Sequence, residues 1–169
     1  MKKEAFTIVE LIVVVVILGI AALLAVPMIS SAADVQVRSA ANMIAADLEY
    51  AKSMAISTQQ SHSVVFNSAN ESYHLQDASA NPIEHPIKAG SDFVVNLQSD
   101  SRLSRVDIAS ADFEPGSQSA VTFDYLGSPY SGTTTANLNS GQILLQAGSF
   151  GMTVTVEPMT GYVTVQAVP

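Results

Sequence analysis

Apolar and polar positions divide the chain into three stretches with different spacing. The first is a predominantly apolar run from Phe6 to Val26, unbroken from Leu11 onward, in which Glu10 is the only ionisable side chain. At a rise of about 1.5 Å per residue, these roughly 21 residues are enough to cross a bilayer as a helix. A lone carboxylate is costly to bury in hydrocarbon, so Glu10 is a candidate functional residue.

Pro27 interrupts this run and begins the second stretch. A proline inside a helix removes one backbone hydrogen bond and clashes with the preceding turn, which predicts a helix kink at Pro27. Alternatively, Pro27 ends the apolar helix. Beyond it, helical spacing predicts an amphipathic helix that ends near Ser57 or Thr58. Its apolar stripe consists of Val37, Ala40, Ala41, Ile44, Leu48, Ala51 and Ala55.

The third stretch, residues 59–169, alternates with a period of two and predicts a β-rich domain. The segment 157–161 is rich in turn residues, so the last two strands are expected to form a C-terminal hairpin. Residues 127–141 are rich in Ser, Thr, Gly and Asn and are predicted to form an exposed loop. The predicted strands are Ser63–Phe66, Tyr73–Gln76, Phe93–Leu97, Arg105–Ile108, Val121–Asp124, Gln142–Leu145, Met152–Val156 and Tyr162–Val165.

A five-residue segment with two lysines, Met1-Lys2-Lys3-Glu4-Ala5, precedes the apolar run. This arrangement resembles the leader and N-terminal segment of type IV prepilins and type II secretion pseudopilins. The resemblance implies that prepilin peptidase removes residues 1–5 by cutting between Ala5 and Phe6, and that Phe6 is then N-methylated. It also implies that Glu10 acts in fibre assembly, paired with the amine of Phe6 on an adjacent subunit. Alanine stands at position 5, where the family usually has glycine.

A second resemblance covers most of the remaining chain. The segment from Ala45 to Ile56, followed by the Ser63–Phe66 strand and by the segment from Val121 to Pro129, is similar to the GspH/FimT class of minor pseudopilins. This similarity implies an α+β pilin fold, in which residues 6–27 and 28–58 form the two halves of a long N-terminal helix. The amphipathic half packs on an antiparallel domain, residues 59–169, of two sheets.

The resemblance also implies a location and partners. The chain would be a minor pseudopilin of a type II secretion pseudopilus, or a minor pilin of a type IV pilus. It would first be anchored in the bacterial inner membrane as a single-pass protein, with its C-terminal domain in the periplasm, and would then enter the fibre. The implied partners are other pilin or pseudopilin subunits, the prepilin peptidase and an inner-membrane assembly platform.

Two alternatives interpret the N-terminus differently. A basic start, an apolar run and the small residues Ser31-Ala32-Ala33 also fit a secretory signal peptide, which would be cut before Asp34 and would release a secreted β-domain. The apolar run could also serve as a simple anchor helix, with Glu10 reaching the interface.

Charge bears on the possible partners. The formal net charge is −8, and removal of residues 1–5 leaves five cations against fourteen carboxylates, a net charge of −9. So few cations argue against binding of nucleic acid, because cations are needed to release phosphate counterions. A DNA-binding minor pilin of the FimT kind is therefore retained only as an alternative. The sequence contains no cysteine, so disulfides do not contribute to the fold.

No residue pattern indicates catalysis, a cofactor or a metal. The histidines His62, His74 and His85 are scattered, and no Cys or acidic residue stands at ligand spacing beside them. His62 and His74 could become cross-strand neighbours, but partly exposed sheet histidines are the simpler interpretation. The sequence lacks a Gly-x-Ser-x-Gly elbow and a phosphate-binding glycine-rich loop. A structural protein, and not an enzyme, is expected.

Overall fold

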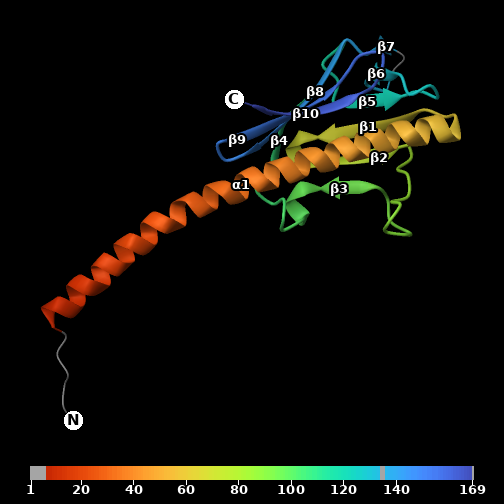
Figure 1. Cartoon of the computed structure of the whole chain (residues 1–169). Helices are drawn as coiled ribbons and strands as arrows, with labels where there is room; N and C mark the ends of the chain where they lie inside the picture. Colours follow the sequence, from red (N-terminus) through yellow and green to blue (C-terminus); the bar gives the residue numbers. More distant parts are fainter. Residues whose placement is uncertain (1–6, 134–135, 169) are drawn as a thin grey trace.

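A computed structural model describes residues 7–133 and 136–168, and within it the side chains of residues 22–31 are not described. One helix, α1, runs from Ile8 to Thr58 and is followed by strands and two short 3-10 turns. Figure 1 shows α1 as a long curved rod whose second half lies against the β-domain, while its first half projects away from it. The architecture is the predicted α+β pilin fold, with the helix packed on two antiparallel sheets.

The second half of α1 supplies one wall of the core. All seven residues of the predicted apolar stripe are fully buried, so the helical spacing in the sequence identified the packed face correctly. Four of the seven are alanines, which bring the helix axis close to the sheets it covers. The helix ends where the sequence predicts, because Gln59 adopts a left-handed conformation with a φ of 55° and stops the helical hydrogen bonding.

The first sheet has six strands in the order β3-β2-β1-β5-β6-β7, and the second has four in the order β10-β9-β8-β4. All described pairings are antiparallel, and β9 and β10 form the predicted C-terminal hairpin. The strands are β1 (His62–Asn67), β2 (Ser72–Gln76), β3 (Val94–Asn96), β4 (Asp107–Glu114), β5 (Ala120–Phe123), β6 (Pro129–Ser131), β7 (Ala136–Asn137), β8 (Ser140–Ala147), β9 (Phe150–Val156) and β10 (Val163–Val168).

The two sheets and α1 enclose a single cluster of buried apolar side chains. Within this cluster the ring centroid of Phe66 lies 5.5 Å from that of Tyr73 and 5.9 Å from that of Phe113. Because Phe66 and Tyr73 belong to the six-stranded sheet and Phe113 to the four-stranded sheet, these rings join the two sheets.

Two predictions about the elements were wrong, and one alternative is excluded. Residues 127–141 are not a plain exposed loop: they contain β6 and β7, which extend the six-stranded sheet, and Ser131 is buried there. Strand β4 begins at Asp107 and continues to Glu114, well past the predicted Arg105–Ile108, because it pairs with β8 along its length. Pro27 does not end the helix, since α1 continues through it.

Candidate functional site

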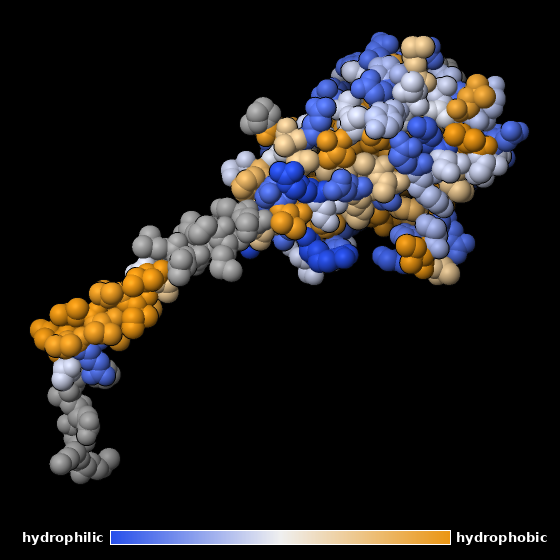
Figure 2. Space-filling view, viewed as in Figure 1, coloured by the Kyte–Doolittle hydropathy of each residue, from blue (hydrophilic) through white to orange (hydrophobic). Residues whose placement is uncertain are grey.

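The part of α1 that projects from the domain carries a dense apolar surface. We call residues 8–21 the stalk; all of them are exposed, and the exposed fractions of the large apolar residues range from 48% at Val14 to 79% at Ile8. Figure 2 shows this segment as an almost uniformly hydrophobic cylinder, whereas the domain surface is mixed. An apolar surface of this extent is rare on a soluble monomer and marks a contact with a membrane or with other protein chains.

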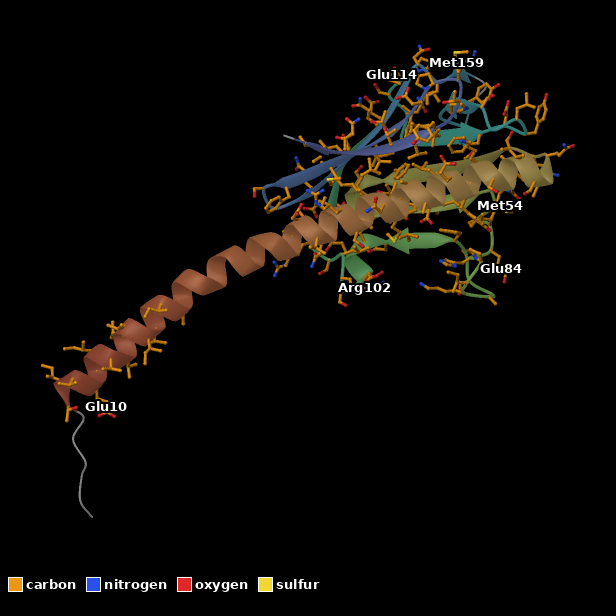
Figure 3. The ribbon with its side chains drawn as sticks, viewed as in Figure 1. Glu10, Met54, Glu84, Arg102, Glu114 and Met159 are labelled. Atoms are coloured by element: carbon orange, nitrogen blue, oxygen red, sulfur yellow. The ribbon has the colours of Figure 1, made fainter. Side chains whose placement is uncertain are left out.

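Glu10 lies in the first turn of the stalk. Thr7 is the N-cap: its side-chain Oγ1 accepts a hydrogen bond of 3.3 Å from the backbone N–H of Glu10, and its carbonyl accepts one of 3.2 Å from Leu11. The Glu10 carboxylate therefore lies at the positive end of the helix dipole, where negative charge is favoured. Figure 3 shows Glu10 at the far end of the stalk, away from every other labelled side chain.

The other predicted site residues differ in what the structure says of them. Ala5 and Phe6, the predicted processing and methylation positions, lie outside the described residues. Pro27 lies within α1, and the predicted kink there stays a prediction. Within the part of the chain whose side chains are described, no helix is both long and apolar enough to cross a membrane.

The domain holds a second feature that the sequence did not indicate. A groove of about 460 Å³ lies between α1 and the segment that leads into β3. On one wall Phe93 stacks between Tyr50, at 5.7 Å, and His85, at 4.5 Å. Asp47 of α1 lines the same groove and accepts a 2.5 Å hydrogen bond from the Tyr73 hydroxyl.

The Asp47–Tyr73 hydrogen bond links α1 to β2 and is partly buried. Burial raises the pKa of Asp47 above its ordinary value, against the lowering effects of the Tyr73 hydrogen bond and of His85. The pKa of Tyr73 is raised well above 10.0, by burial first and then by the charge and hydrogen bond of Asp47. Tyr73 therefore stays a hydrogen-bond donor at physiological pH, and the ionised Asp47 is less favourable in the folded chain than in the unfolded one.

Replacing Asp47 by asparagine should therefore change the pH dependence of stability. A raised folded pKa means that Asp47 contributes most to stability below its unfolded value of 3.8, and that this contribution is lost as the pH rises through the folded pKa. The amide of the asparagine keeps an oxygen for Tyr73 and does not titrate. We expect the stability of Asp47→Asn relative to the wild type to increase from pH 3 to pH 7. Urea unfolding at several pH values measures this difference, and a difference that falls over this range would contradict the assignment.

The histidines do not form a metal site in the described residues, where no group of three or more His, Cys, Asp or Glu could hold an ion. His62 lies opposite Phe123 in β5, whereas His74 lies opposite Val65 in β1. The two histidines are therefore not cross-strand partners.

Most cations of the described chain are already paired with carboxylates. Arg38 contacts Asp34 at 2.8 Å, Lys52 contacts Glu49 at 3.4 Å, and Arg102 contacts Asp100 at 2.6 Å. The Arg102 guanidinium lowers the pKa of Asp100 to about 2. These pairs leave little positive potential for a polyanion.

The fold and the stalk together define the structural class of this protein. A long helix with an exposed apolar stalk and a second half packed on antiparallel sheets is the architecture of a pilin-like subunit. The family model for the type II transport protein GspH matches residues 40–160, and the prokaryotic N-terminal methylation motif matches residues 1–26. The chain therefore belongs to the GspH family and is a minor-pseudopilin-type subunit of a type II secretion system or a type IV pilus.

One solved structure supports this fold at low sequence identity, and a second is reported for comparison. The minor pseudopilin EpsH from the type 2 secretion system of Vibrio cholerae is 13% identical, with a TM-score of 0.53 over 78% of this chain and 97% of that one. The type IV minor pilin FimU of Pseudomonas aeruginosa is also 13% identical, with a TM-score of 0.47 over 79% of this chain and 88% of that one. No curated protein sequence matches the chain.

Proposed function

We propose that this chain is a structural, non-catalytic subunit that waits in the bacterial inner membrane and is then moved into a fibre. Before assembly the stalk, extended through Val26, would be embedded as a single pass, with the domain in the periplasm. The observation that carries this proposal is the row of exposed apolar side chains from Ile8 to Ile20, interrupted only by Glu10 and Gly19. Nothing in the described domain covers that row.

The apolar side chains of the stalk are suited both to the lipid of a membrane and to the interior of a fibre. Each large apolar side chain gains about 1.5–3 kcal/mol when it leaves water, whether it enters lipid or a bundle of other stalks. An exchange between these two surroundings therefore costs little for the apolar side chains. The sensitive group is the carboxylate of Glu10, because a buried charge needs a partner.

The proposed partner of Glu10 is the amine of Phe6 on a neighbouring subunit. Prepilin peptidase would create this amine by cutting between Ala5 and Phe6, and would methylate it. The methylation motif that matches residues 1–26 supports this step. Methylation keeps the positive charge, so the electrostatic pairing is preserved. An inner-membrane assembly platform would then lift the processed subunit into the growing fibre beside other pilin or pseudopilin subunits.

The N-terminus of the cellular protein tests this proposal. The intact mass of the membrane-extracted chain, together with sequencing of its N-terminal peptide, should show a chain that begins at N-methylated Phe6. A chain that begins at Asp34 would instead mean a cleaved secretory signal and would exclude a role for Glu10 in assembly. A chain that retains Met1 in cells with an active prepilin peptidase would show that Ala5 is not accepted in the place of glycine.

A further inference from the structure

The edge of the four-stranded sheet at β10 carries an unused set of backbone hydrogen-bonding groups. The N–H of Glu157 donates to the carbonyl of Tyr162 at 2.9 Å, which fixes the alternation along the β9–β10 ladder. By that alternation Thr164 and Gln166 exchange hydrogen bonds with β9, whereas the N–H and C=O groups of three residues point away from it. These three residues are Val163, Val165 and Ala167.

No described residue uses these outward groups. β10 pairs with β9 alone, and none of the hydrogen bonds outside the ladders involves Val163, Val165 or Ala167 among the described residues. The strand is regular over Val163–Val168 and carries no charge and no proline. Its last three residues are exposed. A regular, uncharged edge of six residues is a ready template for another strand.

The opposite edge of the same sheet is protected. In β4 the N–H of Ile108 donates to the carboxylate of Glu71, and Phe113 exchanges hydrogen bonds of 2.9 and 3.0 Å with Gln118. The strand also has a register shift between Ile108 and Ser110. Its sequence adds three carboxylates, those of Asp107, Asp112 and Glu114. Such features block strand addition.

The edges of the six-stranded sheet are also short or occupied. β3 spans Val94–Asn96; the N–H of Val94 donates to Asp92 at 2.8 Å, and the carbonyl of Asn96 accepts from the Ser99 hydroxyl at 2.8 Å. β7 spans only Ala136–Asn137. Among the edges that the structure describes, β10 therefore stands apart as long and unprotected.

We propose that the β10 edge binds an extended, uncharged strand of a different subunit of the same fibre, which adds a fifth strand to this sheet. The row of backbone groups specifies an extended segment, because strand addition at a sheet edge uses main-chain hydrogen bonds. β10 has no charged side chain, so it offers no ion-pair partner to a charge on the added strand. Val163 and Val165 pack against the core, so apolar side chains of the added strand would continue that packed row. This inference rests on the proposed function, because it places the partner in the fibre.

The geometry argues against a second copy of this chain as the occupant. Antiparallel pairing of β10 with another β10 is a two-fold arrangement, which would direct the two stalks in opposite directions. Subunits drawn from one membrane into one fibre have their stalks aligned. The β4 edge of a second copy would keep the stalks aligned, because β10 and β4 run in opposite directions, but Glu71 and Gln118 already occupy that edge.

Amide hydrogen exchange at single-residue resolution tests the proposal on the wild-type chain. In the purified full-length chain in detergent, we expect Val163, Val165 and Ala167 to exchange at least roughly tenfold faster than Thr164 and Gln166. In fibres sheared from cells, the three outward amides should slow together to the rates of the inward ones. Outward amides that stay fast in the fibre would overturn the proposal while leaving the proposed function intact. Absence of the chain from the fibre would overturn both.

Two variants at position 165 separate the contribution of the backbone N–H from that of the side chain. Val165→Pro removes the outward N–H and leaves the hydrogen bonds of Thr164 and Gln166 to β9, a place where an edge strand tolerates proline. Val165→Ala removes most of the side chain but keeps the N–H. We expect the fibre content of Val165→Pro to be at least about tenfold below that of Val165→Ala. Equal contents, or a dimer of the purified chain with protected outward amides, would contradict the proposed occupant.

Discussion

Glu10→Ala should leave the chain in the membrane and remove it from the fibre. In an assembled fibre the variant would leave the amine of a neighbouring Phe6 without its partner in an apolar bundle. Breaking a buried ion pair in this way costs about 3–5 kcal/mol, which lowers the ratio of fibre to membrane protein by roughly a hundredfold or more. Quantification of the chain in sheared-fibre and membrane fractions measures this ratio.

Two controls separate the charge from other effects of the change. Glu10→Gln keeps the shape of the side chain and removes only the charge, so it should fail nearly as strongly. Glu49→Ala removes an exposed carboxylate from the same helix, within the domain, and should enter the fibre normally. The N-cap is preserved in all three variants, because the donor to Thr7 is the backbone N–H of residue 10. Normal incorporation of Glu10→Ala would exclude the proposed ion pair.

The long helix was predictable because its signals are local. The spacing from Val37 to Ala55 already defines one face of a helix, and that face is the buried one. The isolated carboxylate of Glu10 is equally visible, since a charge in an apolar run is noticeable without any knowledge of the fold. Pro27 is different: sequence rules permit either a helix end or a helix that continues, and in the structure α1 continues.

The errors lie where pairing decides the conformation. Residues 109–114 contain alanines, a serine and acidic residues with weak strand preference, yet they form β4 because β8 pairs with them. Residues 129–131 look like loop, but Thr122 lies opposite Tyr130 and its hydroxyl donates to the Gly132 carbonyl at 2.6 Å. Such strands are defined by partners distant in sequence, which local patterns do not reveal.

The same limit applies to the sites within the domain. Asp47 and Tyr73 are 26 residues apart, and their contact depends on how α1 lies across β2. The open edge of β10 depends on the order of strands in the sheet, which alternation alone does not give. Sequence reasoning identified the candidate assembly residue in the stalk and could not identify features that arise only from packing.

Gly161→Ala should destabilise the domain strongly, because the Phe123 ring and the backbone of Gly127 pack closely against this residue just before β10. Gly161 has a φ of +59°, and an added Cβ would lie 2.9 Å from the Gly127 carbonyl oxygen and 3.0 Å from the Phe123 ring. The carbonyl of Gly161 also accepts a 3.1 Å hydrogen bond from Lys52, so the residue cannot move freely away from α1. Backbone strain of about 1–2 kcal/mol and overpacking of about 1–3 kcal/mol predict a combined loss of roughly 2–5 kcal/mol.

Gly148→Ala is the matched control, since Gly148 has a similar φ of +62° and nothing lies within 4 Å of an added Cβ. It should cost only the strain, about 1–2 kcal/mol. Urea unfolding of the two variants therefore isolates the contact at Gly161 from the conformational cost that they share. Equal losses would mean that the turn between β9 and β10 does not pack tightly against the β5–β6 turn. A larger loss at Gly161 would show that its contact with Gly127 and Phe123 stabilises the turn that precedes β10.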